Sequence, residues 1–135
     1  MKVILNKCYG GFGISREGYE LYCMKKGLTP NFYINGVPNY LNLIKKNDCD
    51  NLSFYCFLKD YGDRVLETEV DWKTHLYLNT EYREDPVLIE VVEELGEKAS
   101  GRFANLEVVD IPDDMDYVID DYDGIETLRP NTPTW

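Results

Sequence analysis

The chain is poor in histidine and in closely spaced cysteines. Its 135 residues include one histidine, His75, and four cysteines, none of them arranged as C-x-x-C. Structural zinc sites use clusters of these two residue types, so the sequence predicts no bound metal. In the absence of a secretion signal we also expect the cysteines to be reduced thiols.

Long apolar runs are missing as well. No run approaches the roughly 18 residues of a membrane-spanning helix. The apolar start at residues 3–5 turns polar at Asn6, too early for a signal peptide. We therefore expect a cytoplasmic protein without a membrane partner. Apolar residues still make up 44% of the chain, which is enough for the core of one domain.

Positive charge is scarce in the second half of the chain. The net charge is −11. Residues 1–59 contain eight basic and four acidic residues, whereas residues 60–135 contain six basic and 21 acidic residues, a net charge of −15. Phosphate binding needs Lys and Arg, so this half excludes direct DNA binding. Its acidic residues either coat an exposed surface or form a face for a basic partner.

Residues suited to catalysis are also few. Cys8 stands where a helix N-terminus can activate a thiol, but His75, the usual kind of base, is far away in sequence. A calcium loop in the acidic segment 113–126 fails because Ile119 stands at its first ligand position. We therefore expect a protein that is not an enzyme, has no catalytic residues and uses no cofactor.

The most informative stretch that the chain does contain is glycine-rich. It joins the apolar run 3–5 to a predicted helix and has three glycines within four positions. Glycines are favoured where the backbone has positive φ or where another group lies very close to it. Helix N-terminal N–H groups also bind anions, and basic side chains stand at both ends of the stretch. The candidate ligand-binding residues are Lys7, Tyr9, Gly10, Gly11, Phe12, Gly13, Ser15 and Arg16.

Two interpretations of this glycine loop remain open. It is either a tight strand-to-helix turn with close packing, or a phosphate pocket built from backbone amides with Lys7 and Arg16. In the pocket, Tyr9 and Phe12 would offer ring faces to a base; in the turn, they would be core residues. The loop has neither the Gly-Lys-Ser/Thr ending of a P-loop nor the dinucleotide fingerprint.

Two helices are predicted from capping signals. A helix over residues 16–26 begins after Ser15 and ends at Gly27 in the left-handed conformation. A second helix over residues 86–99 has Asp85 as its N-cap, followed by a proline and by an apolar stripe.

Short strands account for most of the remaining predicted structure. Turns are expected at Asn35-Gly36 and Asp123-Gly124. This order indicates a single α+β domain over residues 1–135, a mostly antiparallel sheet with two helices packed on it. Residues 29–75 look like an elaboration of that fold, and residues 129–135 like an extended tail. The predicted strands are 3–5, 32–34, 52–58, 64–70, 74–78, 106–111, 117–121 and 125–128.

Several of these motifs together resemble a family of small uncharacterised phage and prophage proteins. Its members pair a K-C-[FY]-G-G-F-G-[LI]-S start with a D-P-x-L-x-x-V-V-E-E-L-G helix, a Y-D-G-x-E hairpin and a terminal Trp. The matching parts here are residues 7–15, 85–96 and 122–126 and Trp135. The resemblance covers about residues 2–28 and 76–135 and supplies no functional residues. It implies a viral protein that acts in the host cytoplasm, where small phage accessory proteins often counter defence systems.

Two binding functions are consistent with these features of the sequence, and a third interpretation is a structural or virion-associated phage protein, which predicts its presence in purified particles. The first is a non-enzymatic binding protein, formed as a homodimer, that sequesters a phosphorylated or nucleotide-like host signal at the glycine loop. The second is an acidic inhibitor that covers the basic, nucleic-acid-binding surface of a host defence protein, with residues 60–135 supplying the charge.

Overall fold

Three antiparallel sheets and two α-helices make up the described parts of this computed structural model, residues 1–35, 40–43 and 54–131. The fold is α+β, as predicted from the sequence. The strands are divided among three sheets, where the sequence pattern predicts one. The chain groups into two compact units: the first unit comprises Met1–Tyr22 and Leu78–Trp135, and the second unit comprises Cys23–Tyr77.

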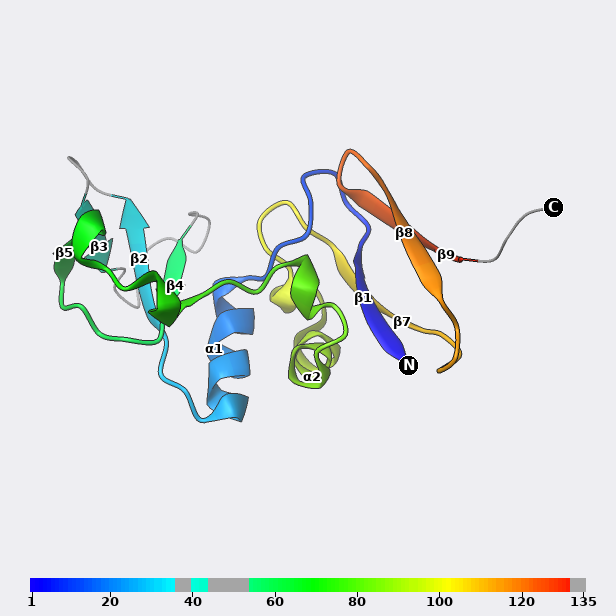
Figure 1. Cartoon of the computed structure of the whole chain (residues 1–135), viewed down its shortest axis with the longest axis horizontal. Helices are drawn as coiled ribbons and strands as arrows, with labels where there is room; N and C mark the ends of the chain where they lie inside the picture. Colours follow the sequence, from blue (N-terminus) through cyan, green and yellow to red (C-terminus); the bar gives the residue numbers. More distant parts are fainter. Residues whose placement is uncertain (36–39, 44–53, 132–135) are drawn as a thin grey trace. The chain divides into compact units, whose positions relative to one another are not determined.

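The first unit contains a long-range pair of strands. Strand β1 (Lys2–Asn6) pairs antiparallel with β7 (Leu106–Asp110), so that Lys2 faces Asp110 and Asn6 faces Leu106. Figure 1 shows the two strands side by side although they come from opposite ends of the chain. Four consecutive residues of β1, from Val3 to Asn6, are buried, which explains the short apolar run at the start of the sequence.

Helix α2 (Pro86–Leu95) belongs to the same unit and starts as predicted. The Asp85 side chain accepts hydrogen bonds from the N–H groups of Val87 and Leu88. The regular helix ends at Leu95, because Gly96 has a φ of +58° and a 3₁₀ turn, Gly96–Ala99, follows. The predicted helix over 86–99 is therefore ten α-helical residues and one 3₁₀ turn. The buried residues of α2 are Leu88, Ile89, Val91 and Val92.

Helix α1 (Arg16–Lys26) has the predicted bounds and caps. The Oγ of Ser15 accepts a hydrogen bond from the Gly18 N–H at 3.1 Å, and Gly27 follows the helix with a φ of +71°. The residues that pack its apolar side are Tyr19, Tyr22 and Cys23, all buried.

A β-hairpin completes the first unit. Strand β8 (Tyr117–Tyr122) pairs with β9 (Ile125–Pro130) through the two-residue turn Asp123-Gly124. Both turn residues have positive φ, 51° and 92°, as the predicted type I′ turn requires. Part of the predicted tail, Arg129 and Pro130, is the end of β9; residues 132–135, including Trp135, lie outside the described residues.

The second unit has its own five-stranded sheet, in the order β5-β3-β2-β4-β6. Two predicted strands are shorter than expected. The 3₁₀ turn Glu67–Glu69 replaces part of the predicted strand 64–70, and the 3₁₀ turn Trp72–Thr74 takes the first residue of the predicted strand 74–78, of which only His75–Leu76 is a strand. Gly36, Cys49 and the first two residues of the predicted strand 52–58 lie outside the described residues. The strands are β2 (Asn31–Asn35), β3 (Tyr40–Leu43), β4 (Tyr55–Phe57), β5 (Arg64–Leu66) and β6 (His75–Leu76).

The second unit also buries its own core, which consists of Tyr33, Leu41, Phe57, Val65 and Val70.

A last 3₁₀ turn, Thr80–Tyr82, belongs to the first unit and leads toward helix α2. Neither α-helix in the described ranges has the length and apolar character needed to cross a bilayer.

Candidate functional site

The glycine loop runs from β1 to α1 and packs against two other loops of the first unit. The Gly10 N–H donates to the carbonyl oxygen of Asp123 at 3.3 Å, which ties the loop to the β8–β9 turn. At the other end of the loop, the Gly101 N–H donates to the carbonyl oxygen of Gly13 at 2.9 Å. The close packing proposed for this loop from its sequence is therefore present at both ends.

The contact between the loop and the hairpin turn leaves no room for a side chain. A Cβ added to Gly124 would lie 2.5 Å from the Gly11 nitrogen and 2.8 Å from the Gly10 nitrogen. A Cβ added to Gly10 would lie 2.4 Å from the Cβ of Phe103. Gly11 has a φ of +96° but open space around its Cβ position. Gly10 and Gly124 thus serve packing, whereas Gly11 serves only the backbone conformation.

The middle of the loop offers unpaired backbone donors. Among the residues described in the structure, no group accepts a hydrogen bond from the N–H of Gly11, Phe12 or Gly13. These three successive amides are the part of the predicted anion pocket that has no hydrogen-bond partner in the described residues.

The two basic side chains of the predicted pocket have protein partners. The Nζ of Lys7 donates to the carbonyl oxygen of Glu126 at 3.2 Å, and its backbone N–H donates to Asn105. The Nε of Arg16 lies 3.4 Å from the carboxylate of Glu20, one turn along α1. An anion at the loop would therefore compete with contacts that both side chains already make.

The remaining predicted residues differ in how they are placed. Tyr9 is 61% exposed next to the glycines. Phe12 is half-buried, with the guanidinium carbon of Arg83 5.2 Å from the centre of its ring. Ser15 caps α1 and also donates from its Oγ to the Lys98 carbonyl oxygen, so its hydroxyl is occupied. Of the two aromatic residues, only Tyr9 presents most of its ring to solvent.

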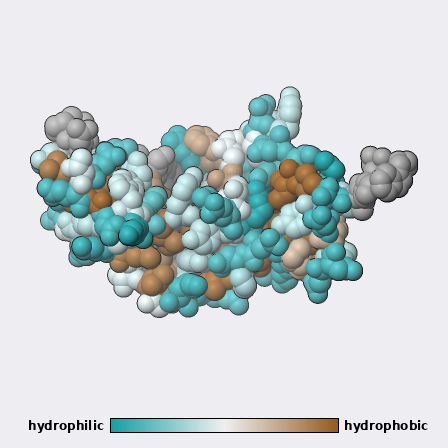
Figure 2. Space-filling model, viewed as in Figure 1, coloured by the Kyte–Doolittle hydropathy of each residue, from teal (hydrophilic) through white to brown (hydrophobic). Residues whose placement is uncertain are grey.

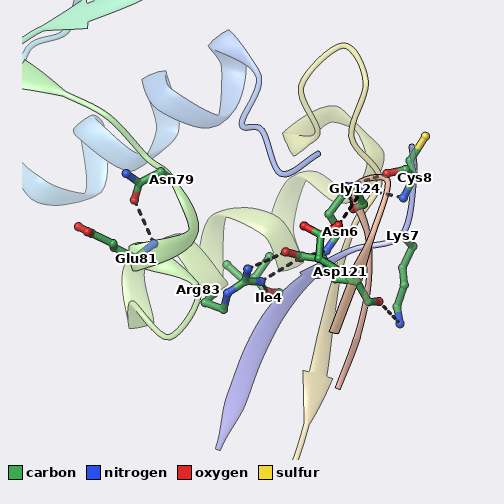
Figure 3. A network of polar contacts seen from close by, with 10 residues as sticks. Ile4, Asn6, Lys7, Cys8, Asn79, Glu81, Arg83, Asp121 and Gly124 are labelled. Atoms are coloured by element: carbon green, nitrogen blue, oxygen red, sulfur yellow. Dashed lines mark hydrogen bonds and ion pairs between the residues drawn. The ribbon is translucent and has the colours of Figure 1, made fainter. Parts of the chain in front are cut away.

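Close to the loop lies a buried ion pair between Arg83, which is labelled in Figure 3, and Glu126. The Nη1 and Nη2 of Arg83 donate to the two carboxylate oxygens of Glu126 at 2.9 and 2.7 Å. Nη1 also donates to the carbonyl oxygen of Ile4, and the backbone N–H of Asn6 donates to Glu126. Strand β1, the segment before α2 and strand β9 are joined by this single pair of side chains.

Asn6 extends the network to the glycine loop. Its side chain is fully buried and its Nδ2 donates to the carbonyl oxygens of Cys8 at 2.7 Å and Gly124 at 2.6 Å (Figure 3). Its Oδ1 accepts from the backbone N–H of Asn105 at 2.9 Å. The start of the loop and the hairpin turn are thus held by the same amide.

Opposing effects set the ionisation of Glu126. Burial raises the pKa of this carboxyl group, because it disfavours the charged form. The hydrogen bonds from Arg83 and the Asn6 backbone, together with the charges of Arg83 and Lys7, lower it by more. The pKa of Glu126 therefore lies below its ordinary value of 4.5, and the group is ionised at neutral pH.

Sequence reasoning does not identify this network. The sequence pattern groups Glu126 with the other acidic residues of the segment 113–126, where a calcium loop is excluded, and gives Arg83 no role. The available signal is the isolation of Arg83 as one of few basic residues in a strongly acidic half of the chain. Its partner is 43 residues away in sequence, so no local spacing could indicate the pair.

The second unit contains a cluster of aromatic rings around His75. The centre of the imidazole lies 5.3 Å from that of Phe57, 5.4 Å from Trp72, 5.7 Å from Tyr55 and 6.0 Å from Tyr77. Burial lowers the pKa of His75, which favours its neutral form. The cluster packs β4 and β6 together.

Cysteines contribute no disulfide to the described chain, in which Cys8, Cys23 and Cys56 are free thiols. Cys23 and Cys56 are both buried in the second unit, and a hydrogen bond joins their side chains. That hydrogen bond lowers the pKa of Cys23, and the same contact together with burial raises the pKa of Cys56. Cys8 is half-buried at the start of the glycine loop.

Charge is divided unequally between the two units. The first unit has 18 acidic and seven basic residues, a net charge of −11, and the second has seven of each and is neutral. The whole net charge of the protein is therefore concentrated in the unit that contains the glycine loop and the β8–β9 hairpin.

No family model, curated protein or solved structure matches the chain.

Proposed function

We propose that this is a non-enzymatic binding protein whose first unit binds a basic surface of a partner protein. The observation that supports this most is the concentration of the whole net charge of −11 in one unit, whereas the second unit is neutral. A single-sign field of this kind attracts a complementary surface, speeds association and disfavours partners of like charge.

The resemblance to phage and prophage proteins suggests where such a partner is found. A phage protein acts in the cytoplasm of its host, and the basic proteins there include nucleases and other nucleic-acid-binding defence proteins. Covering a basic nucleic-acid-binding surface with carboxylates would inhibit such a protein by taking the place of phosphates. The proposal is therefore an acidic counter-defence inhibitor.

Salt dependence tests this proposal. Binding of a basic host protein should weaken about tenfold or more between roughly 0.05 and 0.5 M salt, because screening shortens the range of the field. Affinity capture from host lysate at low salt, identification of the retained proteins, and titration of each purified protein at several salt concentrations provide the measurement. If no basic protein is retained at low salt, the proposal is wrong.

A second candidate function keeps the glycine loop as a small-molecule site. It is favoured by the three successive amides of Gly11, Phe12 and Gly13, which have no acceptor within the described ranges, and by the exposed Tyr9. Such a site would sequester a phosphorylated or nucleotide-like host signal, and in a homodimer two copies of the loop would be available.

Calorimetry with ADP-ribose and cyclic nucleotides tests the second candidate. Lys7→Ala should weaken binding by about tenfold if Lys7 leaves the Glu126 carbonyl oxygen for the phosphate, since a charge-assisted contact is lost. Lys26→Ala removes the same charge from the exposed end of α1 and should leave the affinity unchanged. Absence of heat with every ligand, for protein shown to be folded, would exclude this candidate.

A further inference from the structure

Strand β8 forms an open edge of the hairpin sheet. Its partner β9 is joined to it by a two-residue turn, so Tyr122 and Ile125 form the first hydrogen-bonded pair. Along an antiparallel ladder, hydrogen-bonded residue pairs alternate with pairs that are not hydrogen-bonded to each other. The N–H and C=O groups of Tyr117, Ile119 and Asp121 therefore point away from β9. Pro130 lies opposite Tyr117 in a pair that is not hydrogen-bonded, so the missing N–H of proline removes no hydrogen bond between the two strands.

The other side of the hairpin is occupied within the first unit. The carbonyl oxygens of Asp123, Gly124 and Glu126 accept hydrogen bonds from the glycine loop, Asn6 and Lys7. By contrast, the outward backbone groups of β8 have no hydrogen-bond partner anywhere in residues 1–35, 40–43 and 54–131. One edge of the hairpin is thus fixed to the unit and the other is available for pairing.

The side chains near this edge are both apolar and acidic. Val118 and Ile119 are half-buried, and Figure 2 shows a brown, apolar patch on a mostly teal surface where β8 and β9 lie in Figure 1. The only basic side chain of the hairpin, Arg129, is paired with Asp120 at 2.8 Å. The exposed acidic residues in and around β8 are Asp113, Asp114, Asp116, Asp120, Asp121 and Asp123.

We infer that the outer edge of β8 is the docking surface of the first unit, and that it takes an extended, basic segment of the partner protein as an added strand. This inference rests on the proposed function and specifies how the acidic unit binds. Backbone pairing would supply affinity. Each face of β8 has one apolar residue and one aspartate, Val118 with Asp120 and Ile119 with Asp121, so on both faces the added strand would place an apolar side chain near the first and a lysine or arginine near the second.

Charge decides between this occupant and a second copy of the chain. Two β8 strands paired antiparallel about Ile119 would place Asp120 and Asp121 from each copy, four carboxylates, within one five-residue ladder. None of these carboxylates would lie directly opposite another, but their negative charges, and the net charge of −11 on each first unit, repel one another across the pair. A basic segment relieves the same crowding, so it is the occupant that the charges favour.

A designed peptide provides the probe. An acetylated, amidated seven-residue peptide of alternating Lys and Val should bind the whole protein at low salt, measured by fluorescence anisotropy. Amide hydrogen exchange at Ile119 and Asp121 should slow when it binds, because their outward N–H groups become paired. Two further peptides carry N-methyl groups, one on the odd-numbered and the other on the even-numbered residues. Only one of these two sets of N–H groups would point toward β8, so one of the two methylated peptides should bind about tenfold or more weakly than the parent peptide.

Ile119→Pro is the matching change in the protein. It removes an N–H that points away from β9, so the hairpin ladder should persist, and binding of the peptide should fall about tenfold or more. Ile119→Val keeps the N–H and should bind like the wild-type protein. Cross-strand NMR contacts between β8 and β9 check the fold, and the N-methylated peptides keep the test valid if Ile119→Pro disrupts the hairpin.

The outcomes separate this inference from the proposed function. Salt-sensitive binding that neither N-methylation nor Ile119→Pro weakens would overturn edge pairing and leave the acidic surface as the binding site. No binding of the lysine peptide at low salt, together with no basic protein retained from lysate, would overturn both. Self-association of the protein that Ile119→Pro abolishes would replace the basic segment with a second copy of the chain.

Discussion

Replacing Arg83 with methionine is expected to lower the free energy of unfolding of the first unit by about 3–5 kcal/mol. The change leaves the carboxylate of Glu126, which is 3% exposed, without its two guanidinium hydrogen bonds. It also removes the donor to the Ile4 carbonyl oxygen. Adding Glu126→Gln should recover part of the loss, because the uncompensated charge disappears while an Oε1 acceptor remains for the Asn6 N–H.

A matched exposed pair provides the control for this prediction. Arg129 and Asp120 also form an arginine–carboxylate contact at 2.8 Å, but both side chains are more than half exposed. Arg129→Met should therefore change the free energy of unfolding by only about 0–1 kcal/mol. Urea unfolding of both variants compares the two pairs. Equal effects of Arg83→Met and Arg129→Met would mean that the buried pair does not stabilise the unit.

The same ion pair makes the stability depend on pH in the acid range. The pKa of Glu126 in the folded protein is lower than its ordinary value of 4.5, so the folded state favours the ionised form. The stability that follows from this is fully present above about pH 4.5 and is lost as the pH falls through the folded pKa. The difference in unfolding free energy between wild type and Arg83→Met should accordingly shrink below pH 4.5.

Features of the fold that depend on local chemistry could be predicted from the sequence. An aspartate followed by proline starts α2 at Asp85, and glycine in the left-handed conformation ends α1 at Gly27. The Asp123-Gly124 pair forms the predicted type I′ turn. In each case, two or three neighbouring residues determine the backbone, so the local sequence is sufficient.

Features that depend on distant partners could not be predicted in this way. The sequence pattern predicts one sheet, but sheet membership depends on which edges meet, and β1 pairs with a strand about 100 residues away. The predicted strands 64–70 and 74–78 overlap 3₁₀ turns, since side chains such as that of Asp71, which caps Trp72–Thr74, compete locally with strand pairing.

In the candidate site, too, local features could be predicted from the sequence and contacts with distant residues could not. Positive φ is expected for glycines of the loop and is found at Gly10 and Gly11. The residues that press on the loop, Phe103 and Gly124, are about 90 or more positions away and carry no signal in the loop itself. Whether such a loop is a turn or a pocket depends on these partners, so the loop sequence alone could not decide.

Gly124→Ala is expected to have the second large effect, a loss of about 3 kcal/mol or more in the free energy of unfolding. The residue has a φ of +92°, which strains any L side chain, and its Cβ would lie 2.5 Å from the Gly11 nitrogen. That atom and the others nearest to it are backbone atoms of the glycine loop, so they cannot move aside without displacing the loop. Strain and overpacking each contribute about 1–3 kcal/mol.

Gly11→Ala is the matched control, because it separates strain from contact. Gly11 has nearly the same φ, +96°, but nothing within 4 Å of its Cβ position, so alanine there should cost only the strain, about 1 kcal/mol. Thermal and urea unfolding of both variants give the comparison. Equal losses would mean that the hairpin turn and the loop are not in close contact. A larger loss for Gly124→Ala would mean that the loop amides are held by the turn. In that case, Gly11→Ala tests the loop for ligand binding with the least effect on folding.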